Sequence, residues 1–139
     1  EIERKFLIKK EQLPKDLANC SFHKIEQGYL CTDPVVRIRR QDDDIIDYKS
    51  KGLLSREEYN LPLTQESYEH LKPKADGIVI SKTRYLIPEK DGLTIELDVF
   101  HEDYDGLLLA EVEFESEEQA NTYIPPEWFG EDVTYSSAY

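Results

Sequence analysis

The sequence predicts a mainly β protein (α+β) with a few short helices, and three observations support this fold class. Apolar and charged residues alternate with a period of two in several stretches of the 139-residue chain. Hydrophobic residues make up 39% of the chain and include 5 Phe and 9 Tyr, enough to build a core. Neither an internal repeat nor a linker interrupts the pattern, so residues 1–139 are predicted to form one domain.

Eight stretches are expected to be strands, because side chains in a strand point alternately to its two faces. They are residues 1–8, 22–31, 35–41, 45–50, 55–63, 78–87, 93–100 and 107–115. Asp91-Gly92 is a typical dipeptide of a two-residue hairpin turn. The acidic run 42–44 is expected to be a solvated hairpin loop.

The helices are expected to be short. Thr64 is a good N-cap for a helix from residue 65 to about residue 72. Ser116 has the spacing of a capping box with the glutamine three residues later, and it opens a helix that ends before Pro125. Residues 14–18 are expected to form one further helical turn.

One face of most predicted strands is charged, and the charges are sorted by strand. The acidic positions are Glu1, Glu3, Glu58, Glu96, Asp98, Glu111 and Glu113. The basic positions are Lys5, Arg37, Arg39, Lys49, Arg56, Lys82 and Arg84. Alternation alone fits two arrangements, a sheet with a solvated charged face and a barrel with a charged interior. Carboxylates bind hard divalent cations and Arg/Lys pairs bind phosphate oxygens, so the sorted charges favour a site for a polyphosphate chelated to Mg²⁺ or Mn²⁺.

The net charge, the apolar runs and the cysteines limit the partners and the location that we expect for the protein. The formal net charge of -13 makes nucleic acid or an anionic membrane a poor partner. No apolar run reaches the length of a membrane span. Cys20 and Cys31 form no C-x-x-C motif, so we expect reduced thiols and a cytoplasmic location. The assembly state is left open, with a homodimer as one option.

The charged stretches, taken in order, resemble the CYTH proteins, which are the triphosphate tunnel metalloenzymes. Glu1-Ile-Glu-Arg-Lys5 is similar to their E-x-E-x-K motif. The resemblance extends over the whole chain through Gln27-Gly28-Tyr29, Arg37-x-Arg39, Lys49, Ser55-Arg56-x-Glu58-Tyr59, Lys82-x-Arg84-Tyr85, Glu96-x-Asp98-Val99-Phe100, Gly106-Leu107, Ala110-Glu111-x-Glu113 and Trp128-Phe129-Gly130-Glu131-Asp132-Val133-Thr134.

The resemblance implies an eight-stranded antiparallel barrel, or tunnel, with a charged lumen and helices outside. It implies Mg²⁺ or Mn²⁺ bound by metal ligands at Glu1, Glu3, Glu58, Asp98, Glu111 and Glu113. It implies triphosphate ligands at Lys5, Arg37, Arg39, Lys49, Arg56, Lys82 and Arg84. Lys5, Tyr29 and Glu58 are implied to lie close to the chemistry.

The resulting functional prediction is metal-dependent hydrolysis of a triphosphate. Inorganic tripolyphosphate is the favoured substrate, with thiamine triphosphate or a nucleoside triphosphate as other candidates. One alternative is a class IV adenylate cyclase that makes cyclic AMP from ATP. Another is a non-catalytic polyphosphate-binding protein, which is suggested by Asn60, where the family has an acid, and by Asp47, where the family has Thr.

Overall fold

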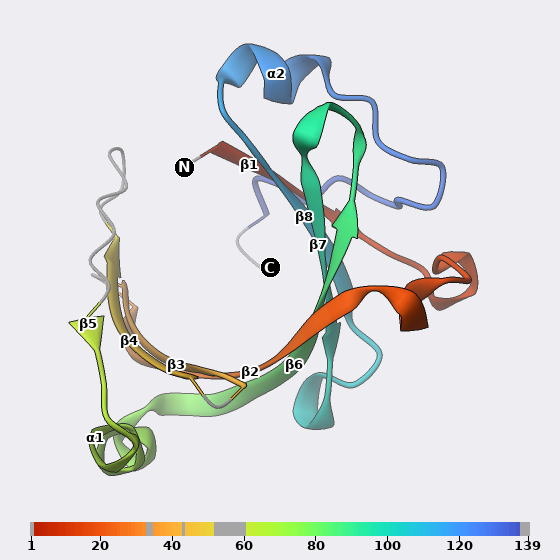
Figure 1. The fold of residues 1–139 in the computed structure, drawn as a ribbon. Helices are drawn as coiled ribbons and strands as arrows, with labels where there is room; N and C mark the ends of the chain where they lie inside the picture. The colour runs from red at the N-terminus through yellow and green to blue at the C-terminus, as the bar shows by residue number, and fades with distance from the viewer. Residues whose placement is uncertain (1, 33–34, 43, 52–60, 137–139) are drawn as a thin grey trace. The chain divides into compact units, whose positions relative to one another are not determined.

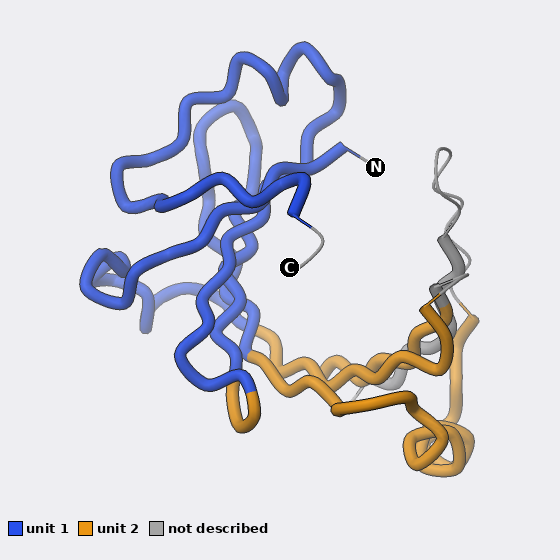
Figure 2. The backbone as a smooth tube through the Cα atoms, turned by 180° about the vertical axis from the view of Figure 1, so that it is seen from behind, with its two compact units in different colours: residues 1–22, 83–100, 104–139 blue, residues 23–82, 101–103 orange. Residues whose placement is uncertain are grey.

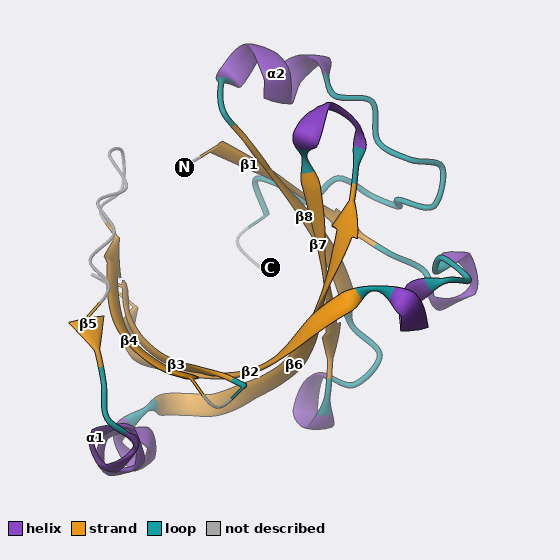
Figure 3. Ribbon diagram, viewed as in Figure 1, coloured by secondary structure: helices purple, strands orange, loops and turns teal. Residues whose placement is uncertain are grey.

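The computed structural model describes residues 2–32, 35–42, 44–51 and 61–136 (Figure 1). Its strands are β1 (Ile2–Leu7), β2 (Ser21–Thr32), β3 (Val35–Gln41), β4 (Asp44–Lys51), β5 (Leu61–Pro62), β6 (Asp76–Pro88), β7 (Thr94–Phe100) and β8 (Leu108–Phe114). The α-helices are α1 (Gln65–Leu71) and α2 (Glu117–Thr122), and the 3-10 turns are η1 (Lys10–Gln12), η2 (Leu17–Asn19), η3 (Lys72–Lys74), η4 (Lys90–Gly92) and η5 (Glu102–Tyr104). Figure 3 shows how strands dominate the described chain, so the prediction of a mainly antiparallel β protein is confirmed.

The predicted caps and turns fold as expected. Thr64 accepts a hydrogen bond from the amide of Ser67, and Ser116 accepts one from the amide of Gln119, so each caps its helix. Asp91 and Gly92 both have positive φ, at 59° and 74°, which is the backbone of a type I′ hairpin turn.

One element prediction differs from the structure, and another lies largely outside the described residues. The helical turn expected at 14–18 begins later, at η2, because its first hydrogen bond runs from the amide of Asn19 to the carbonyl of Asp16. Of the strand expected at 55–63, only β5 and the residue after it belong to the described chain.

The chain divides into two compact units (Figure 2). Unit 1 comprises residues 1–22, 83–100 and 104–139, and unit 2 comprises residues 23–82 and 101–103. The strand order is β1-β8-β7-β6 in unit 1 and β6-β2-β3-β4-β5 in unit 2, so strand β6 contributes residues to both. Among the described residues the order begins at β1 and ends at β5, so the closed barrel stays a prediction. The single domain over residues 1–139 also stays a prediction.

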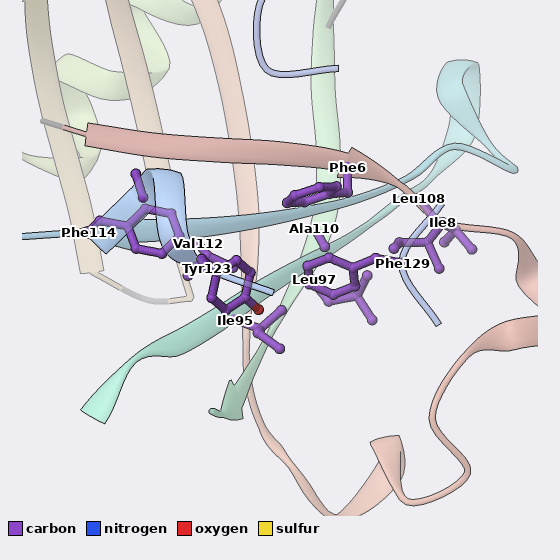
Figure 4. Close-up of a cluster of buried hydrophobic side chains, with 11 residues drawn as sticks. Phe6, Ile8, Ile95, Leu97, Leu108, Ala110, Val112, Phe114, Tyr123 and Phe129 are labelled. Atoms are coloured by element: carbon purple, nitrogen blue, oxygen red, sulfur yellow. The ribbon is translucent and has the colours of Figure 1, made fainter. Parts of the chain in front are cut away.

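The hydrophobic core of unit 1 lies on one face of its strands. Phe6 of β1, Leu97 of β7 and Ala110 of β8 are buried there beside one another, because Phe6 and Leu97 are both register partners of Ala110. Figure 4 shows this cluster, which α2 and the segment after it complete through Tyr123 and Phe129. The apolar half of the alternating pattern therefore faces the core, and the charged half lies on the opposite face.

Unit 2 is packed differently, because helix α1 packs against β3 and β4 and reaches Glu26 of β2 through Tyr68. Tyr68 of α1 is fully buried, and its hydroxyl donates to a carboxylate oxygen of Glu26 at 2.9 Å. Lys72 forms an ion pair with the same carboxylate at 3.0 Å. A Cβ on Gly28 would lie 3.0 Å from the Cβ of Ala75. The absence of a side chain at Gly28 therefore allows the backbone after α1 to pack closely against β2.

The C-terminal segment 130–134 pairs with the outer edge of β1. The amide of Gly130 donates to the carbonyl of Leu7 at 2.8 Å, and the amide of Val133 donates to the carbonyl of Lys5 at 2.8 Å. Arg4 holds the same segment from the side, since its guanidinium donates to Asp132 at 3.1 Å and to the carbonyls of residues 120 and 123 at 3.1 Å. This edge of β1 is therefore already occupied at residues 5–7.

Candidate functional site

The acidic face of unit 1 lies opposite its core and is built by register. In an antiparallel pair, residues directly opposite each other share a face. Glu3 of β1 is opposite Glu113 of β8, and Lys5 is opposite Glu111. On its other side, Glu111 is opposite Glu96 of β7. The two-residue alternation noted in the sequence therefore brings carboxylates from three strands onto one surface.

Arg84 of β6 is held on this face by two carboxylates of β7. Its Nε and Nη2 donate to Oδ1 and Oδ2 of Asp98 at 2.8 and 2.9 Å, a bidentate pair. Its Nη1 forms an ion pair with Oε2 of Glu96 at 2.7 Å. The exposed fractions of these side chains are 14% for Arg84, 1% for Asp98 and 31% for Glu96. Asp98 is therefore a buried partner of Arg84, whereas Glu96 lies partly in solvent.

The charges on the acidic face shift two pKa values. Burial alone would lower the pKa of Arg84, but its hydrogen bonds to Asp98 and the nearby carboxylates raise that pKa above its ordinary value. Burial raises the pKa of Glu96, Arg84 lowers it, and the charges of Glu111, Asp98 and Glu113 raise it further. The net result for Glu96 is a raised pKa, so the ion pair with Arg84 does not fully compensate burial and the nearby carboxylates.

The carboxylates of the acidic face carry the charge and the oxygen ligands that a divalent cation needs. Two described cations, Lys5 and Arg84, share the acidic face with a larger set of carboxylates, namely Glu3, Glu96, Asp98, Glu111 and Glu113. Surplus carboxylate oxygens are the ligands that Mg²⁺ and Mn²⁺ prefer. Within the described ranges, no three acidic, His or Cys side chains converge as a ready-made metal site. Two of the predicted ligands, Glu1 and Glu58, lie outside those ranges.

The basic face of unit 2 carries the predicted phosphate ligands. Arg37 of β3 is opposite Tyr29 of β2, and Arg39 is opposite Gln27, so these four side chains share the face that α1 does not cover. On the other side of β3, Arg37 is the register partner of Lys49 in β4. The structure thus brings a predicted catalytic residue, Tyr29, to the same sheet face as two predicted triphosphate ligands.

The two arginines of the basic face differ in what their guanidinium nitrogens contact. The side-chain oxygen of Gln27, which is only 4% exposed, accepts from Nε and Nη2 of Arg39 at 3.1 and 2.9 Å. An amide orients a guanidinium and leaves its charge in place. The Nε of Arg37 is buried and has no hydrogen-bond partner among the described residues. An unpartnered buried donor is costly, so an acceptor supplied by a ligand would relieve that cost.

Several predicted site residues have no described side-chain surroundings. Arg56, Glu58, Asn60 and Glu1 lie outside the described residues, and the structure describes Lys49 and Asp47 by their backbone in β4. Lys82 is buried in β6 with 6% exposure. The metal and phosphate roles assigned to these residues stay predictions.

The sequence pattern gives no role to two residues that shape the two faces, Glu96 and Gln27. Glu96 counts only as an acidic position, and the pattern does not predict the Asp98–Arg84 pair, because alternation gives the face of a residue and not its partner. Gln27 was part of a matched motif without an assigned role. Its polar side chain on an otherwise basic sheet face was the only available signal.

Antiparallel strands with sorted acidic and basic faces define a β protein whose site residues lie on strands rather than on loops. The model of the CYTH domain matches residues 1–132 of the chain. The chain therefore belongs to the CYTH domain family, and the resemblance noted in the sequence is confirmed.

Two relatives and one solved structure are similar to the whole of this chain and to most of their own lengths. An inorganic triphosphatase of Nitrosomonas europaea is 41% identical over 145 residues, covering 100% of this chain and 92% of the relative. An inorganic triphosphatase of Acetivibrio thermocellus is 32% identical over 145 residues, covering 100% of this chain and 88% of the relative. The crystal structure of an inorganic triphosphatase superposes with a TM-score of 0.75 at 39% identity, covering 100% of this chain and 92% of that chain.

Proposed function

We propose that the chain hydrolyses inorganic tripolyphosphate in a reaction that depends on Mg²⁺ or Mn²⁺. The observation that carries the proposal is the surplus of carboxylates over cations on the acidic face of unit 1. Such a surplus is unfavourable in a confined site unless a cation balances it. The two relatives that are inorganic triphosphatases support tripolyphosphate as the substrate.

In this proposal, the basic face of unit 2 binds the phosphate groups of the substrate. The buried Nε of Arg37 has no hydrogen-bond partner among the described residues, and the amide oxygen of Gln27 orients Arg39, so both guanidinium groups are placed to contact a polyanion. We assign Lys49, Arg56, Lys82 and Arg84 to the same set of phosphate ligands. Phosphoryl transfer has a loose transition state, so catalysis depends mostly on positioning and on charge neutralisation.

The acidic face would hold the cation. We assign Glu1, Glu3, Glu58, Glu111 and Glu113 as its ligands, and Asp98 stays in this set although Arg84 contacts both of its oxygens. A bound divalent cation neutralises phosphate oxygens and lowers the pKa of bound water. Lys5, whose register partner is Glu111, would place its ammonium beside the reacting phosphate, with Tyr29 as a second group near the chemistry.

The proposal includes the closed eight-stranded tunnel with a charged lumen, because only closure would bring both faces around one ligand. A cytoplasmic location and a homodimer also belong to the proposal. Of the helices in the described part of the chain, none combines the length and apolar composition needed to cross a bilayer.

Two other functions remain as alternatives to be tested. A class IV adenylate cyclase would convert ATP to cyclic AMP and pyrophosphate. A non-catalytic polyphosphate-binding protein would bind tripolyphosphate tightly and release no phosphate with either metal ion.

The test is phosphate release from tripolyphosphate, thiamine triphosphate, ATP and pyrophosphate, each with Mg²⁺, with Mn²⁺ and with chelator. We expect release from tripolyphosphate to be fastest and to stop with chelator. Cyclic AMP from ATP would favour the cyclase, and saturable binding without release would favour the binding protein.

A further inference from the structure

The two carboxylates that hold Arg84 differ in how they hold it. Asp98 takes two donors of the guanidinium with a side chain that is 1% exposed. Glu96 takes Nη1 through a single contact of 2.7 Å, and its side chain is 31% exposed. A buried bidentate pair is fixed by geometry, whereas a single contact at the solvent boundary exchanges more readily.

The charge of Arg84 is already balanced by Asp98, so Glu96 is the surplus anion of this group. Its surroundings are acidic, since Glu111 lies opposite it in the register and Glu113 lies further along the same strand. The side chain nevertheless occupies a donor that a phosphate oxygen would use.

We propose that Glu96 is a built-in competitor for Arg84, which a polyphosphate must displace from Nη1 in order to bind. Glu96 thus weakens anion binding, while Asp98 keeps the guanidinium in place during the exchange. This inference rests on the proposed function, because it assumes that the chain binds polyphosphate through Arg84.

The competition through contact must be separated from the general effect of removing a negative charge. Glu115 provides the matched control, because it is an exposed carboxylate directly after β8 and has no ion pair with Arg84 within the described part of the chain. Glu96→Gln and Glu115→Gln both remove one charge and keep the shape of the side chain. Only Glu96→Gln removes the competing carboxylate.

The experiment is isothermal titration calorimetry of the full chain with tripolyphosphate in the presence of chelator. We expect Glu96→Gln to bind about tenfold more tightly than the wild type, equivalent to about 1.4 kcal/mol. Glu115→Gln is expected to change the affinity less than about threefold, because its charge acts on the ligand only at long range and is screened. Equal changes in the two variants, or weaker binding by Glu96→Gln, would overturn the proposal.

A second variant is needed because the glutamine of Glu96→Gln can still accept a hydrogen bond from Arg84. Glu96→Ala removes the acceptor altogether and is expected to bind tripolyphosphate at least as tightly as Glu96→Gln, with a circular dichroism spectrum like that of the wild type. Tight binding by Glu96→Gln but not by a folded Glu96→Ala would contradict displacement. If no variant and no wild-type protein binds tripolyphosphate with or without metal ions, the proposed function itself fails.

Discussion

The amide of Lys5 donates a hydrogen bond to the hydroxyl oxygen of Thr134 at 3.1 Å. The carbonyl of Lys5 accepts from the amide of Val133 at 2.8 Å, so the C-terminal segment holds both polar groups of this residue's backbone. The hydroxyl of Thr134 donates in turn to Asp132 at 2.5 Å. The side chain proposed to lie nearest the chemistry is therefore positioned by a segment that is distant in sequence.

Thr134→Val removes the hydroxyl while keeping the shape of the side chain. We expect a loss of about 1–2 kcal/mol in the free energy of unfolding, because the Lys5 amide and Asp132 each lose a partner. We also expect kcat for tripolyphosphate to fall more than the affinity does. Denaturant unfolding and steady-state kinetics check these outcomes. Thr134→Ser keeps the hydroxyl and should behave like the wild type, and loss of activity in both variants would argue against the hydrogen bond as the cause.

Gly130→Ala should detach the C-terminal segment from β1. A Cβ at this position would lie 2.5 Å from the carbonyl oxygen of Leu7, closer than real contacts allow, and the neighbouring backbone hydrogen bond would have to break. We expect a destabilisation of about 2 kcal/mol. Glu131→Ala is the control, since Glu131 meets β1 through its carbonyl oxygen alone. Equal melting temperatures for Gly130→Ala and the wild type would show that the segment is dispensable.

Glu26 should make the stability depend on pH. Burial opposes its charge, but hydrogen bonds from Lys72 and Tyr68 outweigh burial and lower its pKa. A lowered pKa in the folded state contributes stability above the unfolded-state pKa, near 4.3, and this contribution is lost as the pH falls through the folded-state pKa. Glu26→Gln is therefore expected to be less stable than the wild type at pH 7, by about 1 kcal/mol after solvent screening.

The measurement is thermal unfolding of Glu26→Gln and the wild type from pH 7 downward. The difference in melting temperature should shrink once the pH drops below about 4. Glu69→Gln, an exposed position on the same helix, is the matched control and should show no such dependence. A difference that is constant with pH would contradict the charged role of Glu26.

Gln27→Glu should weaken polyphosphate binding by placing a carboxylate against Arg39. The glutamine oxygen already accepts from two nitrogens of this guanidinium, so the substitution keeps the geometry and removes the net charge. We expect the affinity for tripolyphosphate to fall by about tenfold in calorimetry, in line with one charge-assisted contact. Unchanged affinity would show that Arg39 does not contact the ligand.

The predictable part of the structure follows from the period of two. Alternation places Glu111 and Glu96 on one face and Ala110 and Leu97 on the other, and the register confirms both assignments. The spacing of the capping residues also predicts both α-helices, because a cap is an interaction between residues close in sequence.

The unpredicted part depends on partners that are distant in sequence. Nothing in the local pattern around Arg84 indicates that Asp98 takes two of its donors and Glu96 a third. Equally, Arg4 lies in the first motif but serves to hold Asp132, which is 128 residues away along the chain. Pairing of this kind is set by three-dimensional packing, which a single sequence does not display.

The central claim is that the acidic face of unit 1 binds the cation that hydrolysis requires. Glu3→Ala and Glu111→Ala remove carboxylates from two strands of that face, and the exposed Glu118→Ala on α2 is the control. The most direct measurement is phosphate release from tripolyphosphate with Mg²⁺ or Mn²⁺ by these folded variants. We predict a loss of at least about a hundredfold, or about 3 kcal/mol of transition-state stabilisation, for Glu3→Ala and Glu111→Ala, and wild-type rates for Glu118→Ala. Wild-type rates in Glu3→Ala or Glu111→Ala would contradict the account.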